Sequence, residues 1–161
     1  MVPAPAAARG IMRSMSRPAI ESYDSDFVEW TARNADLMRQ GRFDEADVPH
    51  IIEEIEDLGK NWHRALDSHT YQLIAHLLKW EYQPDYPGRS GWKRSIAAQR
   101  IEIRKLLRKA PSLGLWLQEH LEENYADAVE LATAETGLAA ARFPQRCPYI
   151  VENILDGNFL P

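Results

Sequence analysis

The segment PHIIEEIEDLGKNWHRALDSHTYQLIAHLLKWEY, residues 49–82, sets the pattern for the rest of the chain. Its apolar side chains and two of its histidines recur every three or four residues, the spacing that places them on one face of an α-helix. The positions on this face are Ile51, Ile55, Leu58, Trp62, Leu66, His69, Leu73, His76, Leu77 and Trp80. We therefore expect a long helix whose apolar face is buried by the other helices. Gly59 marks the place where this helix could bend or divide, because an interior glycine weakens a helix.

The flanking segments also have helical spacing. Further helices are predicted over residues 24–40, 90–110, 112–136 and 148–157, with Gly41 and Gly137 in the position typical of a helix stop. No alternating β-branched run and no internal repeat is present, which argues against a sheet or a solenoid. The expected fold is all-α, a single-domain helical bundle of about five helices with short connections over residues 23–161. Residues 1–22 have no amphipathic period and are expected to be a disordered tail.

Composition narrows the class of protein. The 161 residues suit one domain, and no apolar run approaches the ~20 residues that cross a bilayer, so a soluble protein without a membrane partner is expected. Cys147 is the only cysteine, which excludes an intramolecular disulfide and fits the reducing cytoplasm. It sits at a predicted helix start, where a thiol pKa can fall, although a buried small residue is the favoured interpretation.

Several short motifs follow one another in a recognisable order. They are YDSDFVEWTARNADLMRQGRFDEAD from residue 23, IIEEIEDLGK from 51, HLLKWEYQP from 76, RSGWKRSI from 89, APSL from 110, ETGL from 135 and FPQRCPYIVENILDGNFLP from 143. Together they resemble domain-of-unknown-function family twenty-nine (DUF29), a bacterial helical family. The resemblance implies a single all-α domain in a bacterial cytoplasm. It brings no activity, cofactor or catalytic residue with it.

Three histidines and one glutamate form a candidate polar pocket. His69 and His76 lie on the inward face of the long helix, His120 lies on the inward face of residues 112–136, and Glu54 shares the side of His69 and His76. Such residues inside a bundle could serve a metal-dependent enzyme. However, His69 and His76 are about 10.5 Å apart along the helix, too far for one ion, and no Glu-x-x-His pair is present. We therefore favour hydrogen-bonded structural histidines and expect no metal and no cofactor.

The charge is distributed unevenly. Residues 89–109 contain eight of the nineteen basic side chains and one acidic side chain, whereas the whole chain has a net charge of −5. The candidate anion or nucleic-acid face consists of Arg89, Lys93, Arg100, Arg104 and Arg108. The acidic outer face of residues 112–136 is an alternative partner for these cations. Nucleic acid is thus a possible partner but not the favoured one.

The loop between the second and third predicted helices is rich in proline and aromatic rings. Tyr82, Tyr86 and Trp92 surround it, and they form a candidate partner loop. Nucleotide-binding, serine-hydrolase, zinc-protease and paired-cysteine motifs are absent, and no catalytic residue is identified. The favoured function is a protein-interaction or regulatory module, with a protein partner or a homo-oligomer, rather than an enzyme.

Overall fold

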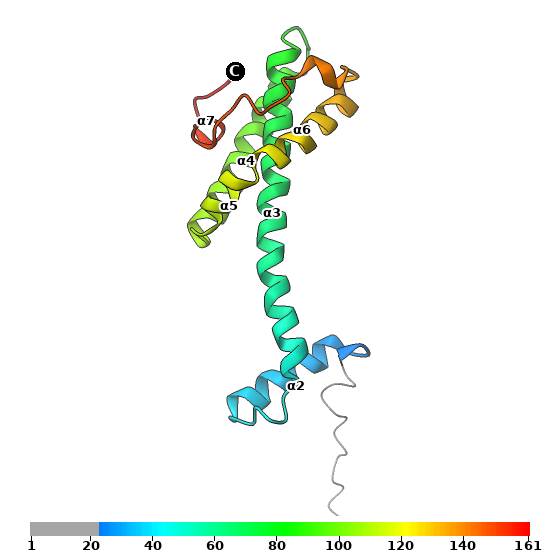
Figure 1. The fold of residues 1–161 in the computed structure, drawn as a ribbon, viewed down its shortest axis with the longest axis vertical. Coiled ribbons are helices and arrows are strands. Elements are labelled where there is room, and N and C mark those ends of the chain that lie inside the picture. Colours follow the sequence, from blue (N-terminus) through cyan, green and yellow to red (C-terminus); the bar gives the residue numbers. More distant parts are fainter. Residues whose placement is uncertain (1–22) are drawn as a thin grey trace, which may run out of the picture. The chain divides into compact units, whose positions relative to one another are not determined.

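The computed structural model describes residues 23–161, and within them every regular element is a helix. The helices are α2 (Phe27–Arg39), α3 (Val48–Tyr82), α4 (Arg89–Lys109), α5 (Leu113–Glu119), α6 (Leu121–Thr136), a 3₁₀ turn η1 (Ala140–Arg142) and α7 (Val151–Leu155). The predicted all-α fold is confirmed (Figure 1). The tail predicted over residues 1–22 lies outside the described residues.

The helices form two compact units. The first ends at Glu56 and the second is Asp57–Pro161, so α3 contributes to both. The prediction of one domain over residues 23–161 stays a prediction.

Helix α3 runs unbroken through Gly59 for 35 residues (Figure 1). Its second half has the predicted buried face: Leu66, Leu73 and Leu77 are fully buried. Its first half does not, because Ile55 and Leu58 are each 61% exposed. The expectation that the apolar face is covered along its whole length was therefore wrong for this half.

In the first unit, a buried polar network joins α2 to the start of α3. The carboxylate of Asp47 accepts a hydrogen bond from Trp30 Nε1 at 3.0 Å, and Asn34 Oδ1 accepts one from the Asp47 backbone at 2.8 Å. His50 Nδ1 lies 2.7 Å from the same carboxylate, and Tyr23 stacks on the His50 ring. Asp47 is 3% exposed and is the centre of this network.

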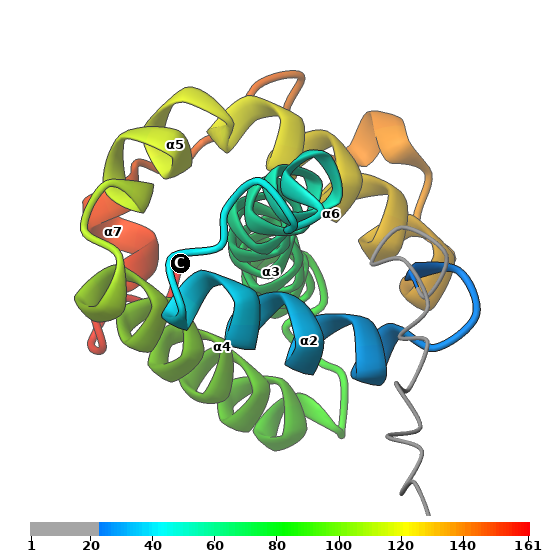
Figure 2. The same cartoon turned by 90° about the horizontal axis from the view of Figure 1, so that it is seen from below.

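In the second unit, the remaining helices surround the C-terminal half of α3. The view along α3 in Figure 2 shows α4, α5, α6 and α7 distributed around it. Each contributes fully buried side chains to one core, among them Ile96 and Ile103 from α4, Leu117 from α5, Ala128 and Ala132 from α6 and Ile154 from α7. This core is the reason that the second half of the α3 face is buried.

The helix predicted over residues 112–136 is divided at His120. This residue leaves the helical region at φ −101° and ψ 10°. The side chains of His120 and Asn124 both bond to backbone carbonyls one turn earlier, at Trp116 and His120. Such bonds compete with the regular helical ladder and favour a break. Asn124 and Trp116 also donate to Asp67 of α3, which fixes α5 and α6 on the long helix.

The C-terminal segment is held by a buried arginine. Arg100 of α4 is 3% exposed, and it donates from Nε to the carbonyl of Ile154 and from Nη2 to the carbonyl of Phe159, each at 2.7 Å. A weaker contact of 3.5 Å reaches the carbonyl of Gly157. Helix α7 begins at Val151 and ends at Leu155, so it is shorter than the predicted 148–157.

Candidate functional site

The three inward histidines each have a separate hydrogen-bond partner. His69 Nδ1 lies 2.6 Å from Gln99 Oε1, His76 Nδ1 donates to the carbonyl of Gln72 at 2.8 Å, and His120 Nδ1 donates to the carbonyl of Trp116 at 2.9 Å. Burial lowers the pKa of His76, and the neighbouring Lys79 charge lowers that pKa further. The His69 bond joins α3 to α4, whereas His76 and His120 bond to carbonyls four residues earlier, so the three rings have three different partners.

Glu54, the fourth residue of the candidate polar pocket, accepts a hydrogen bond of 2.7 Å from the hydroxyl of Tyr23. This bond raises the pKa of Tyr23 to about 12, because the phenol must stay protonated to donate to the carboxylate. Within residues 23–161, no group of three His, Cys, Asp or Glu side chains is arranged to hold a metal ion. Glu54 lies in the first unit, and the three histidines of the candidate pocket lie in the second.

The basic face of α4 contains fewer free cations than the sequence indicates. Arg100 points inward, and Arg89 folds back onto Trp80, with its guanidinium 3.9 Å from the ring centroid and a 2.9 Å bond to the Trp80 carbonyl. Both residues are therefore structural, and neither belongs to an exposed ridge. Lys93, Arg104 and Arg108 remain exposed. No carboxylate in the described part of the chain pairs with these three.

An open depression, lined by two apolar and two arginine side chains of α4, accompanies these cations. Ile101, Arg104, Leu107 and Arg108 line a depression of about 470 Å³, which we call the α4 groove. A smaller hollow of about 130 Å³ adjoins it, and the two share Ile101 and Arg104. Ile101 is 46% exposed, so an apolar side chain stands in solvent beside two arginines. A surface of this kind suits a ligand that has both apolar and negatively charged groups.

The candidate partner loop is occupied largely by its own side chains. Tyr86 stacks on Trp92 at a centroid distance of 4.6 Å, and Tyr82 packs edge-on against Phe143 at 5.1 Å. Gly88 permits the first contact, because a Cβ there would stand 2.5 Å from the Tyr86 ring. Tyr86 is 49% exposed and remains the accessible ring of the three. The loop thus offers one aromatic edge rather than a cage.

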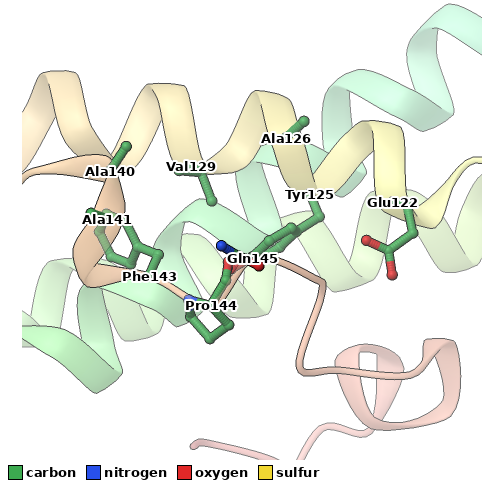
Figure 3. A pocket seen from close by; sticks show the side chains of 9 residues that line it. All are labelled: Glu122, Tyr125, Ala126, Val129, Ala140, Ala141, Phe143, Pro144 and Gln145. Carbon is green, nitrogen blue, oxygen red and sulfur yellow. The ribbon is translucent and has the colours of Figure 1, made fainter.

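A further pocket of about 410 Å³ lies between α6 and residues 140–145 (Figure 3). Figure 3 shows Tyr125, Phe143 and Pro144 among the side chains that line it, with the Glu122 carboxylate at one end. The Tyr125 hydroxyl donates to the Pro144 carbonyl at 2.7 Å, and burial raises the pKa of Tyr125 to about 12. The phenol is therefore protonated and already engaged, and it provides no catalytic base.

Cys147 is not an activated thiol. Its Sγ donates to the carbonyl of Tyr149 at 3.4 Å, and burial raises the thiol pKa above its ordinary value. Tyr149 itself donates to Glu81 at 2.6 Å, and burial raises its pKa as well. A protonated thiol is a poor nucleophile, so this cluster is structural.

The surface that the sequence analysis missed lies in the first unit. Its exposed large apolar side chains, between 43% and 76% accessible, are Phe27, Val28, Met38, Phe43, Val48, Ile52 and Ile55. Phe27 and Met38 are exposed, although Trp30 and Leu37 on the same helix are buried. The helical spacing of Val48, Ile52 and Ile55 was visible in the sequence. Spacing alone does not tell an exposed apolar stripe from a buried one.

The described helices are not suited to crossing a membrane, because none is both long and apolar enough. No curated protein and no solved structure matched the chain. One family model, described as "Domain of unknown function DUF29", matches residues 22–160, which agrees with the motifs and with the all-helical fold. The chain therefore belongs to the DUF29 family.

Proposed function

We propose that this protein is a protein-interaction module whose first unit binds a partner that presents apolar side chains flanked by lysine or arginine. The observation that carries the proposal is the exposure of Val48, Ile52 and Ile55, which are 43%, 50% and 61% accessible on one helix. They are separated by four and three residues, so they form one stripe, which we call the α3 stripe. Clustered exposed apolar residues of this kind are typical of interaction sites.

The α3 stripe is left uncovered by its own unit for a geometric reason. The side chains that tie α3 to α2 and Tyr23 are Asp47, His50 and Glu54. An α-helix has 3.6 residues per turn, so each residue is rotated by 100° from the one before it. Viewed down the helix axis, the mean direction of these three positions is more than 120° away from the mean direction of the stripe. The polar network therefore fixes α3 with the apolar stripe turned away from α2.

The charge of the first unit supports a basic partner. Residues 23–56 contain ten acidic and three basic side chains, a net charge of −7. Glu53 and Glu56 lie on one side of the α3 stripe, and both are exposed. A basic partner would be attracted to this surface and an acidic one repelled, because complementary potentials direct association.

Site-specific photocrosslinking in cells tests this proposal. A photoreactive amino acid replaces Ile55 in one variant and Leu115 in a control variant, because Leu115 is a similarly exposed side chain, 62% accessible, on α5. We expect a discrete protein adduct from position 55, weakened at high salt, and none from position 115. Absence of an adduct at 55, or equal adducts at both positions, would contradict the proposal.

Nucleic-acid binding through α4 is the second candidate, favoured by the exposed cations Lys93, Arg104 and Arg108, which pair with no carboxylate in residues 23–161. Against it stand the internal positions of Arg89 and Arg100 and the apolar side chains that line the α4 groove. Fluorescence anisotropy with a labelled single-stranded oligonucleotide tests this candidate. If α4 binds nucleic acid, the affinity for the oligonucleotide should fall as the salt concentration rises, and binding should be lost in R104E/R108E.

A further inference from the structure

We propose that the partner of the first unit is a second copy of this chain, and that the α3 stripe of one copy docks in the α4 groove of the other. This inference rests on the proposed function and names its partner. The two surfaces are different from each other, and each copy has both.

Electrostatic complementarity is the first argument. Residues 23–56 have a net charge of −7. On α4, Arg89 and Arg100 are engaged internally, which leaves six cations, Lys93, Arg94, Arg104, Lys105, Arg108 and Lys109, against Glu102. The outward side of α4 thus has an excess of five positive charges. Opposed surfaces with charges of this size attract one another over distances set by the ionic strength.

Apolar complementarity is the second argument. The α3 stripe spans eight residues from Val48 to Ile55, and its ends are about 10.5 Å apart along the helix. The α4 groove also spans eight residues, from Ile101 to Arg108. In the stripe the apolar groups form a row with acidic groups alongside, whereas in the groove Ile101 and Leu107 lie on either side of Arg104. Packing one helix on the other would bury Ile52 and Ile55 against Ile101 and Leu107.

The contact joins unlike surfaces, so it is heterologous. Such contacts produce either a closed assembly in which every stripe is occupied or a chain of copies that lengthens with concentration. Both outcomes raise the mass in solution above the 18.5 kDa of one chain. Both also weaken as salt screens the charges.

A reciprocal charge exchange tests the contact. The first variant, E53K/E56K, places cations beside the α3 stripe, and the second, R104E/R108E, places carboxylates in the α4 groove. A matched control, E119K/E123K, makes the same change in net charge as E53K/E56K, on exposed residues of α5 and α6. All of these positions are exposed, so circular dichroism should show unchanged helix content.

Light scattering after size exclusion measures the mass of each sample. We expect association by the wild type and the control, and an increase of about tenfold or more in the apparent dissociation constant of either charge variant. An equimolar mixture of E53K/E56K and R104E/R108E should associate again, because each altered surface then finds an oppositely charged one. Recovery on mixing excludes misfolding as the cause of the loss.

Three results would overturn the inference: a monomeric wild type, charge variants that associate as the wild type does, or a mixture that fails to recover. If the wild type is monomeric and the Ile55 crosslinker captures a different protein, the proposed function stands and the second copy is the wrong partner. If the wild type is monomeric and binds the oligonucleotide through Arg104 and Arg108, α4 is a nucleic-acid surface.

Discussion

Replacing Arg100 with methionine is expected to release the C-terminal segment. Arg100 makes two bonds of 2.7 Å to the carbonyls of Ile154 and Phe159, and both link residues more than fifty positions apart. Ile154 lies in the last turn of α7, where carbonyls have no partner within the helix. Methionine preserves the apolar stem of the side chain and removes all of its donors, so the variant isolates the hydrogen bonds.

The structure also sets the size of the effect. A hydrogen bond from a charged donor contributes about 1.5–3 kcal/mol, which gives about 3–6 kcal/mol for the two short bonds. The loss of stability in the variant should be smaller than this sum, because Phe159 is half-buried and its carbonyl can turn toward water. We therefore expect the free energy of unfolding to fall by about 2–4 kcal/mol.

Urea denaturation measures this loss, with Arg104→Met as the control on the same helix. Arg104 is exposed and has no carboxylate partner in the described residues, so its replacement should change stability by less than about 0.5 kcal/mol. Amide hydrogen exchange should speed up at residues 154–160 in Arg100→Met alone. A loss below about 1 kcal/mol, or unchanged exchange in that segment, would refute the role assigned to Arg100.

Three other perturbations probe separate parts of the fold. Asp47→Ala leaves the buried Trp30 indole N–H without an acceptor and should cost about 1–3 kcal/mol, seen as faster hydrogen exchange throughout α2; normal exchange there would contradict the network. Gly88→Ala pushes a methyl group into the Tyr86 ring, so the near-ultraviolet circular dichroism of the loop should weaken while helix content is retained; an unchanged spectrum would argue against the stacked pair. The lowered pKa of His76 means that the unfolded state takes up its proton first as pH falls below about 6.5, so stability declines as pH falls from there toward the folded pKa. His76→Gln should lose this part of the acid sensitivity in denaturation series at several pH values, and an unaltered pH dependence would count against it.

The apolar periodicity of α3 predicted burial correctly for only part of the helix. From Leu66 to Trp80 the apolar spacing predicted burial correctly, because α4, α5, α6 and α7 supply a core around that half of α3. From Ile51 to Leu58 the same spacing continues, yet Ile55 and Leu58 are exposed. Spacing shows that a helix has an apolar face, and only the tertiary structure shows what covers it.

The arginines of α4 show that the sequence does not tell a buried cation from an exposed one. Arg100 and Arg104 are one turn apart and look equivalent in the sequence. Arg100 is buried because three carbonyls from residues 154–159 surround it, and Arg104 is exposed because none do. The candidate histidines were predicted correctly as hydrogen-bonded groups beside the core, but their partners came from local carbonyls and from Gln99, which no spacing rule identifies.

Hydrogen exchange of dilute and concentrated protein is the most direct test of the central claim, that the α3 stripe of one copy binds the α4 groove of another. Because an interface excludes solvent, the claim predicts slower exchange at residues 48–56 and 100–108 in the concentrated sample. Residues 121–136 of α6 should exchange equally in both samples. Rates that do not depend on concentration in either segment, or protection that appears in α6 instead, would contradict the claim.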